Sequence, residues 1–178
     1  MKKLIYAALI LVTAIGCIQA KNDKNDNGTE SSNTAQAPIR NTEKLAPFKI
    51  LTTDSTYFSY KDLKPGKPVM LIYFAPDCGH CHDLMKELKP QFKQLAKVQV
   101  VLVTWTKYES LKPFYKEFEL AKQPNFKVGT EGYDMPVQKY YQIAQTPFTI
   151  LYDKNGKLVK AFPKAPKADE LLAEVKKV

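Results

Sequence analysis

Apolar and polar positions divide the 178-residue chain into three segments of different character. Residues 4–15 form an apolar run that follows two lysines. Residues 18–45 are rich in Asn, Asp, Lys, Ser and Thr and contain few large apolar side chains. Such a segment cannot offset its ordering entropy by burial, so we expect a disordered tether. Residues 46–178 contain spaced apolar runs and are long enough for one domain with its own core.

Short apolar runs bounded by turn residues predict the strands of this domain. Two of them, 69–75 and 98–103, lack alternation of apolar and polar positions, as expected for strands covered on both faces. Asn155-Gly156 lies between two other runs and is typical of a β-hairpin turn. The predicted strands are 48–51 and 57–58, which form a first hairpin, then 69–75, 98–103, 125–128, 148–152 and 157–160.

Apolar positions three and four residues apart predict the helices. The clearest pattern runs from Leu84 to Leu95, and Pro90 should kink the helix there. The other predicted helices are 110–121, which Pro113 should interrupt, 137–143 and 168–175. Strands that alternate with helices, followed by a hairpin and a closing helix, indicate an α/β sandwich.

Two cysteines lie at the start of the first of these helices, in the sequence Cys78-Gly79-His80-Cys81. Unpaired amides and the positive end of the dipole at a helix N-terminus favour thiolate over thiol, and the thiolate is the nucleophile. The spacing lets the second sulfur attack a mixed disulfide formed by the first. Cys17 is the only other cysteine, so no pair remains for a structural disulfide. The pattern therefore predicts thiol–disulfide exchange.

Three motifs together resemble the thioredoxin superfamily, and specifically its exported TlpA/ResA-like branch of thiol–disulfide oxidoreductases. They are Tyr73-Phe74-Ala75 before the Cys78–Cys81 motif, Thr146-Pro147-Phe148 at the start of a later strand, and the turn 153–157. The resemblance covers nearly all of residues 46–178. It implies a thioredoxin fold, with a central mixed sheet flanked by helices, an N-terminal β-hairpin and a short central insertion.

The resemblance also implies a role for each residue of the site. Cys78 would be the exposed attacking thiol and Cys81 the buried resolving thiol. Pro147 would be a cis-proline lying against the cysteine pair, where a missing N–H is tolerated at the start of a strand. The backbone of Thr146 would pair with the bound substrate chain. The substrate would be a protein thiol or disulfide, and no cofactor or metal is expected.

Gly79, His80 and Asp77 are expected to tune the cysteine pair. Gly-His is the dipeptide of protein disulfide isomerase, and an imidazole near a sulfur stabilises thiolate, which makes the disulfide more oxidising. Asp77 replaces an aromatic residue of the family and would either cap the helix or oppose thiolate formation by its charge. Ile72 stands where thioredoxin has a buried acid, so the sequence names no proton acceptor for Cys81.

Two other functions compete with this interpretation. Cys78-x-x-Cys81-His82 is also the pattern of covalent c-type haem attachment, in which His82 would be an axial ligand. Small c-type cytochromes are helical, whereas this pattern directly follows a buried strand, so His82 is instead predicted to be a solvated residue of the first helical turn. The second alternative is a non-catalytic module that holds unfolded chains beside Pro147. The intact cysteine pair argues against it.

The N-terminal apolar run is short for a transmembrane helix, which needs roughly 20 residues, and is typical of an export signal. Gly16-Cys17 resembles a bacterial lipobox, although Ala14 stands where that motif usually has leucine. A plain secretory signal and an uncleaved anchor are the alternatives. We predict a signal peptide over 1–16, a lipidated Cys17 with the tether over 17–45, and the thioredoxin-like domain over 46–178.

Charge adds little to this interpretation. The net charge is +9, but the lysines are dispersed and do not alternate with arginine and aromatic residues as in nucleic-acid-binding proteins. We therefore expect no nucleic-acid partner. The expected partners are protein thiols and disulfides, an upstream membrane electron donor or acceptor, and the membrane through the lipid anchor. The predicted location is a bacterial cell envelope, with the domain facing the periplasm or the outside.

Overall fold

The two buried apolar runs of the sequence form neighbouring parallel strands, β3 (Val69–Tyr73) and β4 (Gln99–Thr104). Every residue of β3 is buried, which explains why the run shows no alternation. The computed structural model describes residues 41–178. The predicted signal peptide, the predicted lipidation site Cys17 and most of the predicted tether lie outside the described residues.

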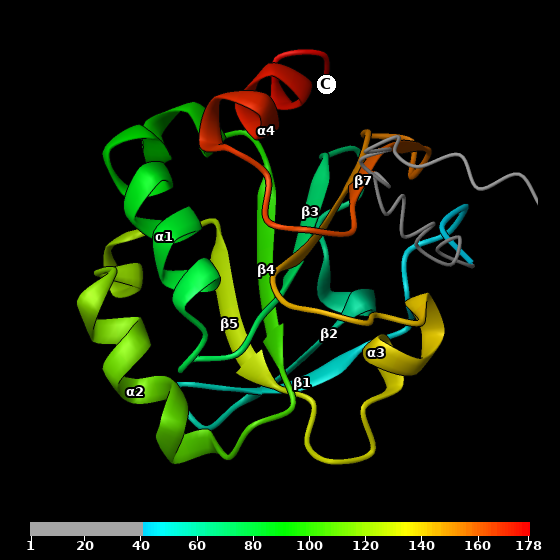
Figure 1. Cartoon of the computed structure of the whole chain (residues 1–178). Coiled ribbons are helices and arrows are strands. Elements are labelled where there is room, and N and C mark those ends of the chain that lie inside the picture. Colours follow the sequence, from blue (N-terminus) through cyan, green and yellow to red (C-terminus); the bar gives the residue numbers. More distant parts are fainter. Residues whose placement is uncertain (1–40) are drawn as a thin grey trace, which may run out of the picture. The chain divides into compact units, whose positions relative to one another are not determined.

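The other strands extend the sheet on both sides of this pair (Figure 1). β5 (Phe126–Thr130) is parallel to β4, and β6 (Phe148–Tyr152) is antiparallel to β3. β7 (Leu158–Phe162) pairs with β6, and β1 (Lys49–Thr52) pairs with β5 and with β2 (Tyr57–Ser59). The order β2-β1-β5-β4-β3-β6-β7 makes one mixed seven-stranded sheet. It confirms both predicted hairpins and the mixed sheet of the thioredoxin fold.

The first long helix changes from an α-helix to a 3-10 helix near a proline. Helix α1 (Gly79–Leu88) continues directly into the 3-10 helix η2 (Lys89–Leu95), whose second residue is Pro90. Proline has no N–H to donate to the preceding turn, so the helix changes type next to the residue where a kink was predicted. No helix of residues 41–178 has both the length and the apolar character needed to span a membrane. The remaining helices are α2 (Tyr108–Glu117), α3 (Pro136–Tyr141), α4 (Ala168–Val175), and the short 3-10 helices η1 (Tyr60–Asp62) and η3 (Leu120–Lys122).

The prediction that Pro113 interrupts the second helix is wrong, because α2 runs through this residue. Pro113 removes the partner of the Glu109 carbonyl. Both residues are exposed, so water can bind the free carbonyl. Leu111 and Phe114 on the opposite side of α2 are buried and hold the helix against the sheet.

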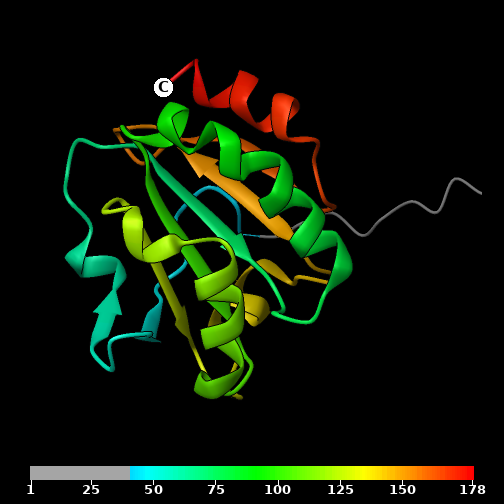
Figure 2. The same cartoon turned by 90° about the vertical axis from the view of Figure 1, so that its left-hand side faces the viewer.

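The two faces of the sheet are covered by different helices. Because side chains alternate along a strand, Met70 and Ile72 of β3 face α1, α2 and α4, whereas Leu71 and Tyr73 face α3. Figure 2 shows α1, α2 and α4 lying over the first face. Cys81 belongs to the core on this face, so the helix start that contains the cysteine pair is fixed by packing.

The described domain includes residues that the sequence pattern placed at the end of the tether. The Tyr152 hydroxyl lies 2.9 Å from the carbonyl oxygen of Thr42 and 2.8 Å from that of Lys44. The amide of Ala46 donates a hydrogen bond of 2.8 Å to the buried Tyr141 hydroxyl. Buried hydroxyls need partners, and backbone groups of this polar segment supply them. The ordered part of the chain therefore begins before residue 46.

Candidate redox site

The chain leaves β3 and reaches the cysteine pair through a short loop. Cys78 is the N-cap of α1, with an extended backbone at φ −83° and ψ 117°. Its carbonyl accepts hydrogen bonds from the amides of Cys81 and His82, at 3.0 and 3.1 Å. Its own amide donates to the carbonyl of Ala75 at 3.1 Å. The Cys78 sulfur thus sits at the positive end of the helix dipole, with no acidic residue in the first turn of α1.

The two cysteines have very different surroundings, and both are free thiols. Cys81 is 1% exposed, whereas Cys78 is half-buried. Burial, together with a hydrogen bond from its thiol to Cys78, raises the pKa of Cys81 to about 12. Partial burial also opposes ionisation of Cys78, but hydrogen bonds from the Cys81 thiol, the Thr146 side chain and the amides of Cys81 and His80 outweigh it. The net pKa of Cys78 is therefore lowered.

Thr146 and Pro147 lie beside the pair, although they are far from it in the sequence. The Thr146–Pro147 peptide bond is cis, as the resemblance implied. The Cys78 thiol donates to the Thr146 carbonyl oxygen across 3.5 Å. This contact exists only for the thiol, because a thiolate has no proton to donate. Thr146 also lines a pocket of about 290 Å³ with Tyr73 and Trp105, so the surface beside Thr146 is hollowed.

The expected tuning residues make few side-chain contacts. Asp77, Gly79 and His80 are all exposed. The prediction that Asp77 could cap the helix is wrong, because the N-cap is Cys78 and no side chain caps this end. The backbone turns at Cys78, so Asp77 lies one residue too early to cap. His80 acts on the Cys78 sulfur through its amide, and a direct effect of its ring stays a prediction.

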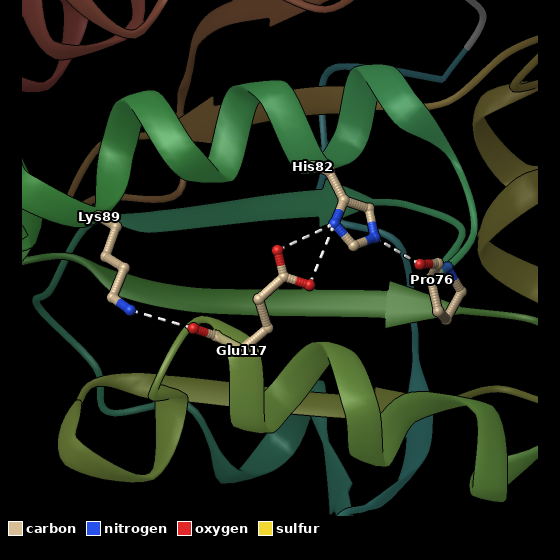
Figure 3. A network of polar contacts seen from close by, with 4 residues as sticks. All are labelled: Pro76, His82, Lys89 and Glu117. Carbon is tan, nitrogen blue, oxygen red and sulfur yellow. Dashed lines mark hydrogen bonds and ion pairs between the residues drawn. The ribbon is translucent and has the colours of Figure 1, made fainter.

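His82 is partly buried and makes specific contacts, so the prediction of a merely solvated residue is wrong. Its Nε2 donates to the carbonyl oxygen of Pro76 across 2.7 Å, and its Nδ1 lies 3.3 Å from both carboxylate oxygens of Glu117. Its ring also makes edge contacts with Phe114 and Phe118, at centroid distances of 5.2 and 5.5 Å. Figure 3 shows the ring of His82 between α1 and α2. In the sequence, the signal for these contacts was the spacing of Phe114, Glu117 and Phe118, which places the three side chains on one face of a helix.

The haem alternative does not fit these surroundings. Both ring nitrogens of His82 are engaged by protein groups, so neither is free to bind iron. Cys81 is packed in the core, where a covalent porphyrin bond would have to displace apolar side chains. Within residues 41–178, no group of three or more His, Cys, Asp or Glu side chains is arranged to hold a metal ion.

One partly buried acid was missed by the sequence reasoning. Glu131 accepts hydrogen bonds of 2.7 Å from the Tyr73 hydroxyl and from the amide of Val137, and burial raises its pKa. Tyr73 packs on the α3 face of the sheet, whereas Cys81 packs on the α1 face. Glu131 therefore stabilises the turn before α3 and does not stand in for the buried acid that Ile72 replaces.

The chain belongs to the family of thioredoxin-like domains, whose pattern it matches over residues 63–178. No curated protein matches the chain significantly.

Solved structures of similar fold come from several bacteria. A secreted disulfide oxidoreductase of Mycobacterium tuberculosis is 20% identical with a TM-score of 0.63, over 74% of this chain and 96% of that one. The thioredoxin domain of a thiol–disulfide oxidoreductase from Bacteroides vulgatus is 22% identical with a TM-score of 0.63, over 76% and 96%. An exposed lipoprotein thioredoxin of Streptococcus pneumoniae is 24% identical with a TM-score of 0.59, over 75% and 100%.

Proposed function

We propose that this protein is a thiol–disulfide oxidoreductase that exchanges disulfides with protein substrates through Cys78 and Cys81. The observation that supports this most directly is the asymmetry of the pair. One sulfur is half-buried at a helix N-terminus with a lowered pKa, and the other is buried with a raised pKa. This is the arrangement of an attacking and a resolving thiol. Two of the similar structures are described as disulfide oxidoreductases.

The proposed reaction proceeds in two exchanges. The Cys78 thiolate attacks one sulfur of a substrate disulfide, which forms a mixed disulfide and releases the other substrate sulfur as a thiolate. Cys81 then loses its proton and attacks the Cys78 sulfur, which forms the Cys78–Cys81 disulfide and releases the second substrate sulfur. Two electrons pass from the protein to the substrate, and the released thiolates take up two protons. The reverse sequence oxidises a substrate dithiol.

Thr146 and Pro147 would hold the substrate chain during these steps. The Thr146 carbonyl already contacts the Cys78 sulfur, so a polypeptide paired with this backbone would bring its own sulfur close to Cys78. An upstream electron donor or acceptor in the membrane would restore the pair after each turnover. We place the protein in the TlpA/ResA-like branch on the combined motifs at Tyr73–Cys81 and Thr146–Phe148.

Insulin reduction tests the proposed activity. With dithiothreitol as the electron source, the purified protein should accelerate the precipitation of insulin chains, and a Cys78→Ser/Cys81→Ser variant should not. Equal rates for the two proteins would contradict the proposal and favour the binding module. The same sample should show no Soret absorption, because a covalent haem would occupy both sulfurs.

We further propose that residues 1–16 are a signal peptide and that residue Cys17 is acylated after cleavage, so that the domain is tethered to an envelope membrane. The similarity to an exposed lipoprotein of Streptococcus pneumoniae supports this. Cys17→Ser should abolish labelling by a fatty-acid analogue and move the protein from the membrane to the soluble fraction. Cys78→Ser/Cys81→Ser should stay labelled, which separates acylation from thiol reactivity. A wild-type protein that is unlabelled and soluble would refute the anchor.

A further inference from the structure

The contacts of His82 anchor the loop that contains Cys78 from both sides. The backbone amide of His82 donates to the carbonyl of Cys78 across 3.1 Å, and its ring Nε2 donates to the carbonyl of Pro76 across 2.7 Å. Cys78 and Asp77 therefore lie within a short loop that one residue holds at two carbonyl oxygens. The direction in which the Cys78 sulfur points depends on this loop.

The two partners of the His82 ring require two ring protons. A carbonyl oxygen only accepts hydrogen bonds, so the contact with Pro76 needs a proton on Nε2. An ionised carboxylate also only accepts, so the contact with Glu117 needs a proton on Nδ1. A neutral imidazole has one N–H and can satisfy only one of these partners. Both contacts are hydrogen bonds at the same time only when His82 is an imidazolium ion.

The surroundings leave Glu117 as the titratable group that faces this ring. From α2, the other contacts are the rings of Phe114 and Phe118. Lys89 is directed elsewhere, since its ammonium group binds the backbone carbonyl of Glu117 (Figure 3). The same group also pairs with the carboxylate of Glu119. On the loop and on α1 itself, the charged or titratable neighbours are Asp77, His80, Asp83 and, one turn later, Lys86. All four are exposed, and within the described residues none makes a side-chain hydrogen bond to His82.

We propose that His82, doubly protonated and paired with Glu117, is a positioning residue for Cys78. It fixes the loop 76–78 and places a positive charge one helical turn from the sulfur. Loss of one proton from His82 removes the charge and breaks one of the two ring contacts, so the thiolate of Cys78 becomes less favoured. The inference rests on the proposed function insofar as this thiolate is the attacking group, and it makes thiolate formation at Cys78 depend on the protonation of His82.

Glu117→Gln tests this proposal without changing the size of the side chain. The Gln amide can donate to an unprotonated Nδ1 while Nε2 keeps its proton on the Pro76 carbonyl, so the loop stays anchored without a charge on His82. Glu109→Gln is the matched control, because Glu109 lies on the same helix, is exposed, and loses the same charge. Each protein is titrated in its reduced form by thiolate absorption at 240 nm and by ¹⁵N NMR of the histidine rings.

In the wild type and in Glu109→Gln, we expect both nitrogens of His82 to be protonated at pH 6, and a step in the Cys78 titration that coincides with the loss of one of these protons. In Glu117→Gln, we expect the neutral Nε2–H tautomer, a single step, and about two- to fivefold less thiolate at pH 6, as for a charge near a helix terminus. His82→Phe, which keeps the ring packing, should also show a single step.

A neutral His82 in the wild type at pH 6, or the same Cys78 titration in Glu117→Gln and Glu109→Gln, would overturn the proposal. The Glu117 side chain is 44% exposed, so its replacement leaves the core intact even where His82→Phe does not fold. These titrations use no substrate. A failure of insulin reduction would therefore refute the proposed function, whereas the coupling between His82 and Cys78 is decided by the titrations alone.

Discussion

Cys81→Ser should accumulate mixed disulfides with client proteins, whereas Cys78→Ser should trap almost none. In Cys81→Ser the half-buried Cys78 can still attack a client disulfide. A serine hydroxyl cannot attack the resulting bond, so the intermediate stays covalent. In Cys78→Ser the remaining sulfur lies in the core, 1% exposed in the wild type, and burial is the main cause of its raised pKa, so it neither reaches a client nor ionises readily. We expect at least a tenfold difference in trapped protein.

Cells that express each variant, quenched with acid and alkylated, should show these complexes on non-reducing gels. The double variant Cys78→Ser/Cys81→Ser sets the background, and circular dichroism verifies that all three proteins fold. Trapping to the same extent by both single variants would show that the roles of the two sulfurs are not distinct.

Iodoacetamide should alkylate Cys78 roughly fiftyfold faster than Cys81 at pH 7. A pKa of about 12 leaves about one Cys81 in 10⁵ as thiolate at this pH, whereas a pKa lowered from 9.0 leaves at least about one Cys78 in 10². The difference in thiolate is therefore at least about a thousandfold. The more basic thiolate is intrinsically more nucleophilic, by about twentyfold over this range, and this reduces the ratio.

The pH dependence of the two rates has a defined sign. Labelling of Cys78 should rise with pH and level off at a lower pH than that of an ordinary thiol, because its pKa is lowered. Labelling of Cys81 should still be rising at pH 10, because its pKa lies near 12. Mass spectrometry of the labelled peptides at short times gives both rates. Unfolding in urea provides the control, since it should bring the rates of the two cysteines together. Comparable rates in the folded protein would contradict the assigned environments.

The strands and the cysteine motif could be predicted because their signals are local. Val69–Tyr73 is buried on both faces and reads as a continuous apolar run, and the position of Cys78 at a helix start follows from the strand before it and the helical pattern after it. The cis peptide at Pro147 came from a resemblance, since no local pattern in the sequence specifies it.

The errors arose where the outcome depends on distant parts of the chain. Pro113 was expected to interrupt a helix, but buried contacts on the other side of α2 keep this helix continuous. His82 was expected to be solvated because the sequence does not say which face of α2 turns toward α1. Two of the partners of the Tyr152 hydroxyl are backbone carbonyls more than a hundred residues away, which no spacing rule could find.

The bond between the Ala46 amide and the Tyr141 hydroxyl also determines where the domain can be cut. Ala46 is fully buried, and its amide lies among apolar side chains. Proteolysis just before this residue would convert the amide into an ammonium group in a place that water does not reach, which is costly for any unpaired charge. It would also remove both carbonyl groups that contact Tyr152. A protease that separates the folded domain from the preceding residues without unfolding it must therefore cleave upstream of Thr42.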